Sequence, residues 1–160
     1  MTPLPLAIVD IDGVVADVRH RLHHVESKPK DWPAFFAAAA ADPPLAEGVA
    51  RVRALLADHD VVYVTGRPEH LRNVTENWLD QNGIGGRTIV MRRHRDFRPA
   101  RATKAEEIRR LARGRTVAVV IDDDPDVCDA LRAAGWPVEQ AEWVPHAKSL
   151  RTAQEKDGRT

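Results

Sequence analysis

Short, continuously apolar runs alternate along most of the chain with segments that repeat apolar residues at helical spacing. The apolar runs are rich in β-branched residues, which is typical of strands buried on both faces of a parallel sheet. They predict strands at 6–10, 61–65, 88–91, 116–121 and 136–140. The amphipathic segments predict helices at 47–58, 69–81, 103–113 and 125–134. This alternation indicates right-handed β-α-β units and a three-layer α/β fold around a central parallel sheet of about five strands.

Residues 14–46 interrupt this alternation directly after the first strand. They combine a stretch rich in histidine and arginine, an aromatic cluster and a run of alanines. We expect a small helical insert that forms a flap or lid beside the sheet. Its aromatic residues fit either packing within the insert or a surface that stacks a nucleobase. These aromatic residues are Trp32, Phe35 and Phe36.

The 160 residues suit one domain with a sizeable core, which we place at 1–153, followed by a polar and frayed tail at 154–160. No apolar stretch approaches the ~20 residues that span a bilayer, and no secretion signal opens the chain. The single cysteine, Cys128, excludes an internal disulfide and a thiolate zinc cluster. We therefore expect a cytoplasmic protein that does not bind membranes.

Charge is distributed unevenly although the formal net charge is zero. The stretch from Arg92 to Lys104 holds six basic residues and one acid, while the stretch from Asp122 to Asp129 holds five acids and no base. The acids favour a bound cation. The basic stretch fits two interpretations, a contact with a phosphate backbone or a solvated loop. Its outer arginines are Arg92, Arg93, Arg95, Arg98 and Arg101.

Two carboxylates, Asp10 and Asp12, end the first strand and are followed by Gly13. The carboxyl ends of parallel strands share one edge of the sheet, where open α/β sheets bind ligands. Two acids so close together repel each other and need a cation or a shared proton. Further polar groups follow in an order that brings them to the same edge: Thr65-Gly66-Arg67, Lys104 and Asp122-Asp123.

These groups suit phosphoryl transfer. Asp10 would attack phosphorus and form an aspartyl-phosphate, and Asp12 would protonate the leaving oxygen and then activate water. Lys104 would pair with Asp10 and the phosphate as charge develops. The Thr65 hydroxyl and the Gly66 amide would hold the non-bridging phosphate oxygens.

The predicted cofactor is Mg²⁺, because carboxylate and carbonyl oxygens are its usual ligands. Its ligands would be Asp10, the main-chain oxygen of Asp12, and either Asp122 or Asp123. A zinc site is disfavoured because the neighbouring histidines lack a carboxylate or cysteine at zinc spacing. These histidines are His20, His23 and His24.

The arrangement resembles the haloacid dehalogenase superfamily of phosphohydrolases, motif by motif over about residues 6–126. The matching residues are Asp10-Ile11-Asp12-Gly13, Thr65, Lys104 and Asp122-Asp123. The resemblance implies a five-stranded Rossmann-like sheet with the first motif on the central strand. It also implies a Mg²⁺-dependent phosphatase.

Within that superfamily the chain is similar to the 3′-phosphatase domain of phage-type polynucleotide kinase. Arg21 lies 11 residues after Asp10, where that family places a functional arginine, and Thr65-Gly66-Arg67 matches its Ser-Gly-Arg. The resemblance implies that Arg21, Gly66 and Arg67 bind phosphate and that the substrate is a phosphorylated nucleic-acid or nucleotide end. One departure is Ala100, which replaces an acid four residues before the motif lysine. No phosphate-binding kinase loop occurs, so kinase activity is not expected.

Two other functions compete with this interpretation. A phosphatase for small metabolites would use the Trp32–Phe36 segment as a closing lid. A receiver module that keeps phosphate on an aspartate fits poorly, because the third predicted strand ends in Met91-Arg92-Arg93 without an acid. A non-catalytic binding protein is disfavoured because all the essential acids are present. The sequence leaves the oligomeric state open.

Overall fold

The five predicted strands form one parallel sheet in the computed structural model, which describes residues 2–160. Their order across the sheet is β3-β2-β1-β4-β5, so β1 is central and is hydrogen-bonded to both β2 and β4. This confirms the predicted three-layer α/β fold class. The strands are β1 Leu6–Val9, β2 Asp60–Pro68, β3 Ile89–Arg92, β4 Val117–Asp122 and β5 Val138–Gln140.

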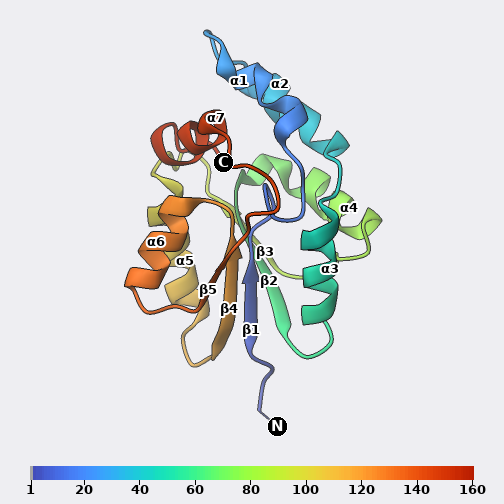
Figure 1. Cartoon of the computed structure of the whole chain (residues 1–160), viewed down its shortest axis with the longest axis vertical. Coiled ribbons are helices and arrows are strands. Elements are labelled where there is room, and N and C mark those ends of the chain that lie inside the picture. Colours follow the sequence, from blue (N-terminus) through green and yellow to red (C-terminus); the bar gives the residue numbers. More distant parts are fainter. Residues whose placement is uncertain (1) are drawn as a thin grey trace.

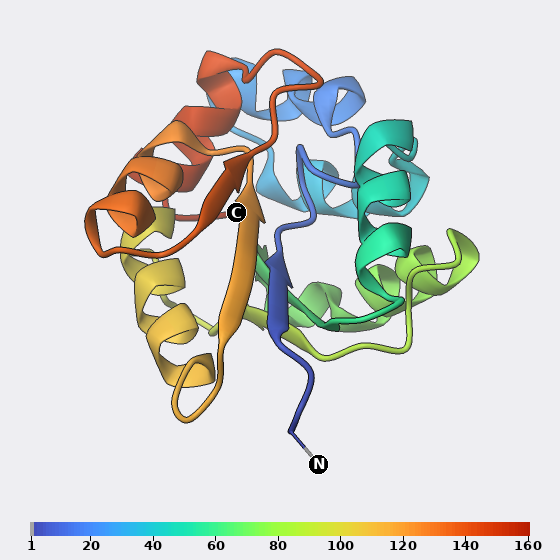
Figure 2. The ribbon, with the colours of Figure 1, turned by 60° about the horizontal axis from the view of Figure 1, so that its bottom comes forward.

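Helices cover both faces of the sheet (Figures 1 and 2). Ala7 and Val9 of β1 pack with α3 (Ala46–Leu55) and α4 (Arg72–Gln81), while Leu6 and Ile8 pack on the other side. The period of two in a strand thus sends alternate residues into two separate cores. The helices on the second face are α5 Ala100–Leu111 and α6 Pro125–Ala133. Within residues 2–160, no helix is both long and apolar enough to cross a membrane.

On the second face, the sequence predicted the start of α6 correctly and the start of α5 wrongly. Helix α6 begins at Pro125 as expected, and the Asp124 carboxylate accepts a hydrogen bond from the Asp126 amide at 2.9 Å. Helix α5 begins at Ala100 rather than near Thr103, because Pro99, with φ of −53°, already leads into the helical turn. The Thr103 hydroxyl donates to the Ala100 carbonyl and caps nothing.

The insert after β1 rises above the carboxyl ends of the strands as a series of short helices (Figure 1). Phe35 and Phe36 are buried in the core on the α3 side, which supports the packing interpretation of the aromatic cluster. Val14 and Val15 are buried there too, so the start of the insert is part of the core. The helices of the insert are η1 Arg19–Arg21, α1 His23–Glu26, α2 Trp32–Ala37 and η2 Ala38–Ala41.

The last residues are ordered, so the predicted frayed tail is wrong. They form α7 (Lys148–Arg151), a π-helical turn η4 (Thr152–Lys156) and a final irregular stretch. The Arg159 amide donates to the Ala153 carbonyl at 2.9 Å, and Lys30 forms an ion pair with Asp157 at 2.5 Å. A polar segment can therefore be held by hydrogen bonds and ion pairs, which composition alone does not reveal.

Candidate active site

A tight turn carries the chain from β1 into the site. The Asp10 amide donates to the Ile121 carbonyl at 2.9 Å, and the Ile11 amide donates to the Asp10 carboxylate at 2.7 Å. Gly13 follows with φ of +79°, and a Cβ at this position would lie 2.0 Å from Oδ2 of Asp123. Only glycine satisfies both conditions. The turn thereby brings the first acid pair against the end of β4.

Three buried carboxylates meet at this edge, from Asp10, Asp122 and Asp123, with one oxygen of each lying within 4.8 Å of the others. Burial raises the pKa of Asp10 to about 7, and the Asp122 and Asp12 charges add to the rise while Lys104 opposes it. Burial, with Asp10 and Asp122 nearby, also raises the pKa of Asp123 well above its usual range. Such a cluster is stabilised by bound positive charge.

The two acids at the end of β4 differ in how their oxygens are used. One Asp122 oxygen bonds to Lys104, and the other accepts a hydrogen bond from the Asp124 amide at 3.0 Å. Oδ1 of Asp123 is buried and has no hydrogen-bond partner within residues 2–160. An unpaired buried carboxylate oxygen is costly unless a cation contacts it. The donor set therefore fits a divalent metal ion, with Asp123 offering the free oxygen.

Lys104 supplies the positive charge of this cluster. It reaches the edge from the second turn of α5, and its Nζ lies 2.6 Å from Asp122 and 3.1 Å from Asp10. Burial lowers the pKa of Lys104, but the charges of Asp10 and Asp122 outweigh it and raise that pKa overall. Ala100 is buried and offers no charge, so Asp122 and Asp10 orient the lysine.

Asp12 faces two buried arginines. Arg67 Nη2 and Nε lie 2.6 Å and 3.0 Å from its Oδ1, and Arg21 Nη2 lies 3.1 Å from the same atom. Burial tends to raise the pKa of Asp12, but the Arg67 and Arg21 charges outweigh it and lower the pKa to about 2. Asp12 is therefore a carboxylate anion held by charge-assisted hydrogen bonds.

Thr65 and Gly66 lie within β2, where its pairing with β3 is interrupted, and they close the site on this side. Thr65 is buried, and its hydroxyl accepts a hydrogen bond from the Arg67 amide at 3.1 Å. The Gly66 carbonyl accepts a hydrogen bond from Arg92 Nε at 3.1 Å. All the residues predicted for the site are thus placed at one edge of the sheet: Asp10, Asp12, Arg21, Thr65, Gly66, Arg67, Lys104, Asp122 and Asp123.

A family model described as the polynucleotide kinase PNKP phosphatase domain matches residues 5–143. The chain belongs to this family. It is therefore a phosphatase of the haloacid dehalogenase type, which confirms the resemblance found in the sequence. Comparison with curated proteins finds no match.

Solved structures share the fold of this phosphatase. A chain of the Pnkp1/Rnl/Hen1 RNA repair complex superposes with a TM-score of 0.71 at 23% identity, covering 86% of this chain and 42% of that one. A haloacid dehalogenase hydrolase from Bacillus subtilis bound to magnesium gives 0.58 at 10%, covering 86% and 88%. A family enzyme from Bacteroides thetaiotaomicron with magnesium and inorganic phosphate gives 0.52 at 11%, covering 92% and 98%. The phosphatase spans less than half of the repair-complex chain.

Asp42 is a buried residue of the site that the sequence analysis missed. Its carboxylate accepts hydrogen bonds from Arg21 at 2.7 Å and 2.9 Å and from Arg67 at 2.8 Å, and it lies 2.6 Å from His20. It fixes the two guanidinium groups that hold Asp12. The sequence Asp42-Pro43-Pro44 is typical of an ordinary turn and gives no sign of a role in the site. The only signal for Asp42 is that two buried arginines need more than one acid.

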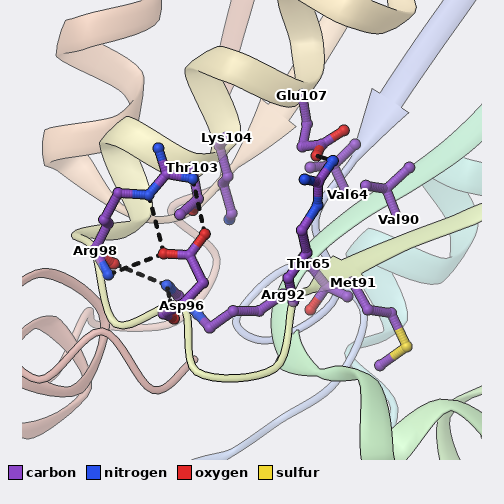
Figure 3. Close-up of a pocket in the computed structure, with 11 residues that line it drawn as sticks. Val64, Thr65, Val90, Met91, Arg92, Asp96, Arg98, Thr103, Lys104 and Glu107 are labelled. Atoms are coloured by element: carbon purple, nitrogen blue, oxygen red, sulfur yellow. Dashed lines mark hydrogen bonds and ion pairs between the residues drawn. The ribbon is translucent and has the colours of Figure 1, made fainter.

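The arginine-rich loop after β3 is mostly paired with acids of the phosphatase itself. Figure 3 shows Arg98 bonded to Asp96, and Arg98 also bonds to Glu106 at 2.8 Å. Arg92 is buried and donates to the main-chain oxygens of Asp96 and Arg98. A cavity of about 20 Å³, roughly the size for one water molecule, lies beside this loop and is also lined by Thr65 and Lys104 (Figure 3). The loop therefore presents few free cations.

The end of the described chain lies inside the site. The Thr160 hydroxyl donates to Oδ2 of Asp12 at 3.0 Å, and its carbonyl accepts from Arg92 Nη2 at 3.4 Å. A Cβ on Gly66 would lie 2.1 Å from the carbonyl carbon of Thr160, so only glycine permits this approach. Thr160 is 4% exposed. A substrate that contacts Asp12 must therefore displace this residue.

Proposed function

We propose that this phosphatase removes the 3′-phosphate from nucleic-acid or nucleotide ends, with Asp10 as the nucleophile. The observation that carries the proposal is the buried cluster in which Asp10 lies beside Lys104 and near two further acids. One lysine among three carboxylates is arranged for a cation and a phosphate to bind together. The family match supports a polynucleotide end as the substrate.

The first step transfers the phosphoryl group to the enzyme. A carboxylate oxygen of Asp10 attacks phosphorus, and the bond from phosphorus to the leaving oxygen breaks as the new bond forms. Asp12 takes up a proton when Arg67 and Arg21 turn from its carboxylate to the bound phosphate. It gives this proton to the leaving oxygen, which departs as a neutral alcohol. Lys104 balances the charge on Asp10 and the phosphate. The Thr65 hydroxyl and the Gly66 amide donate hydrogen bonds to the non-bridging oxygens.

The second step returns the enzyme to its starting state. Water attacks phosphorus opposite Asp10, Asp12 accepts the proton of that water, and the bond from Asp10 to phosphorus breaks. Inorganic phosphate leaves. Arg67 and Arg21 contact Asp12 in this structure, next to the expected place of the dianionic phosphate. We therefore assign both arginines to phosphate binding.

In this scheme Asp10, Asp123 and the main-chain oxygen of Asp12 would hold Mg²⁺. When bound, the ion neutralises the acids and draws charge from the phosphate oxygens. Support for this assignment comes from the unpaired Oδ1 of Asp123. Asp122 is the less suitable direct ligand, because both of its oxygens already have partners.

Mg²⁺ is expected to stabilise the wild-type protein and not Asp123→Asn. At about one hundred times Kd the ion adds about 2.7 kcal/mol, or about 5–10 °C in Tm. Differential scanning fluorimetry with MgCl₂, against NaCl of equal ionic strength, measures the shift. Without Mg²⁺, Asp123→Asn should melt no lower than wild type, because it removes one of three repelling carboxylates. Asp129→Asn, exposed on the helix α6 that follows Asp123, is the control. An equal Mg²⁺ shift in Asp123→Asn would contradict the assignment.

The substrate is tested by phosphate release with Mg²⁺ from four compounds. These are a 3′-phosphate oligonucleotide, its 5′-phosphate isomer, a nucleoside 3′-phosphate and p-nitrophenyl phosphate. We expect kcat/KM to be at least about 10-fold higher for the 3′-phosphate oligonucleotide than for its isomer. Raising salt from about 50 to 200 mM should weaken activity on the oligonucleotide far more than on the mononucleotide.

The same comparison separates the competing substrate classes. Equal kcat/KM values for the oligonucleotide and the mononucleotide would refute recognition of the polymer. A higher kcat/KM for the nucleoside 3′-phosphate than for the oligonucleotide would support the phosphatase for small metabolites, which the internal pairing of the arginine loop favours.

A further inference from the structure

A hollow of about 160 Å³ lies beside the candidate active site, and the mechanism above does not use it. Phe97 stands at its edge and is 52% exposed, and Phe36 and His70 form another part of the wall with their rings 5.4 Å apart. Within residues 2–160, only Leu4 is a comparably exposed large apolar residue, at 53%. An exposed aromatic ring beside a catalytic edge suits a flat partner.

The hollow is connected to the phosphate side of the site through Arg92. This residue lines the hollow, and its guanidinium donates to the Gly66 carbonyl at 3.1 Å and to the Thr160 carbonyl at 3.4 Å. It also lines the small cavity beside Thr65 and Lys104. A group in the hollow is therefore one side chain away from Gly66, which we assign to phosphate binding.

Residues 158–160 run from the hollow to Asp12, and their side chains are arranged like the parts of a nucleoside. The planar guanidinium of Arg159 lies 4.5 Å from the centre of the Phe97 ring, and the hydroxyl of Thr160 donates to Asp12 at 3.0 Å. An alcohol next to Asp12 is the product that the proposed reaction releases there. One flat group and one alcohol, joined by a short linker, correspond to a base and the sugar hydroxyl that carried the phosphate.

We propose that the Phe97 ring in this hollow is the stacking site for the terminal nucleobase of the substrate. The base takes the place of the Arg159 guanidinium, and the sugar oxygen takes the place of the Thr160 hydroxyl. This rests on the proposed function, because it assumes a nucleotide end at Asp12. Stacking is tolerant of base identity, so the site selects for the presence of a base rather than for a sequence.

The test uses a 3′-phosphate oligonucleotide whose terminal base is 2-aminopurine, which loses fluorescence when it stacks on an aromatic ring. Titration in an Asp10→Asn background with Mg²⁺ measures binding without turnover. We expect strong quenching that is lost in Phe97→Ala and kept in Phe97→Trp. Leu4→Ala, matched in exposure but next to the amino end of β1, should leave the quenching unchanged. Quenching that survives Phe97→Ala would overturn the proposal.

Activity on strands with an abasic terminal residue gives a second measurement. Wild type should show kcat/KM about 10-fold lower for the abasic than for the base-bearing 3′-phosphate end, the scale expected for one stacked base. In Phe97→Ala the two substrates should be equal. Because Phe97 is half exposed, this variant should retain the wild-type Tm. A wild-type enzyme that ignores the base while hydrolysing both strands would refute the base site and leave the proposed function standing.

Arg159→Ala tests whether the terminal base displaces the Arg159 guanidinium, because the direction of its effect on substrate binding depends on this displacement. Removing a cation normally weakens nucleic-acid binding, but here it uncovers the Phe97 ring. We therefore expect the preference for base-bearing over abasic ends to increase several-fold. A loss of affinity equal for both ends would identify Arg159 as a phosphate contact and overturn its displacement by the base. If no substrate releases phosphate, the proposed function fails, and the quenching still decides on the base site.

Discussion

Asp10→Asn is expected to lower kcat for phosphate release by a factor on the order of 10³ to 10⁶, the range for loss of a nucleophile. An amide oxygen is a far weaker nucleophile than a carboxylate, and it contributes no charge to a metal ion. The buried contact of Asp10 with Lys104 at 3.1 Å is the geometry on which this expectation depends. Phosphate release under saturating Mg²⁺ and substrate measures the loss.

The matched control for this variant is Asp17→Asn, in the same segment but outside the cluster. Within residues 2–160, Asp17 pairs only with the exposed Arg19, at 2.7 Å. The activity of Asp17→Asn should therefore stay within about two-fold of wild type, as expected for a surface ion pair. Acid quenching of the wild-type reaction should also trap phosphate on the protein in a form that hydroxylamine releases, as an acyl phosphate does. Substantial turnover by Asp10→Asn, with no trapped phosphate, would rule out the aspartyl-phosphate mechanism.

Much of the fold and the meeting of the site residues follows from local pattern. The apolar run of β1 can only be buried on both faces, which requires helices on each side and a parallel sheet. Parallel strands bring their carboxyl ends together, so Asp10, Thr65 and Asp122 had to converge. Lys104 was expected to open a helix next to that edge, and it reaches the edge from the second turn of that helix, α5. The roles of these residues stay predictions until the variants are measured.

The features that sequence did not predict depend on contacts between distant segments. Asp42 sits in a turn-like sequence, and its importance arises only because the insert folds back over Arg21 and Arg67. Thr160 belongs to a polar stretch, and nothing local indicates that Gly66 leaves room for it. The start of α5 was misplaced because Thr103 resembles an N-cap while Pro99 begins the helical turn.

Asp42→Ala is expected to destabilise the protein by about 3–5 kcal/mol, because it leaves buried guanidinium charge uncompensated. The Asp42 side chain is 0% exposed and accepts hydrogen bonds from both Arg21 and Arg67. Without it, Asp12 is the one acid that contacts the two arginines within residues 2–160. For a chain of this size the loss corresponds to a fall in Tm of about 10 °C. Thermal unfolding in the presence of EDTA measures it independently of metal binding.

Asp58→Ala provides the matched control for burial. Asp58 and Asp42 each lie 2.6 Å from a histidine, but the Asp58 side chain is 75% exposed, so its removal should cost less than about 1 kcal/mol. A double variant, Asp42→Ala with Arg21→Met, should recover part of the lost stability, because it leaves one buried arginine facing Asp12 and keeps most of the side-chain volume. Equal melting of Asp42→Ala and Asp58→Ala, or no recovery in the double variant, would show that Asp42 does not hold the arginine pair. If the double variant recovers stability but not activity, two effects of the Arg21 charge are separated. The charge destabilises the fold when Asp42 is absent, and the same charge is needed to bind Asp12 and the phosphate.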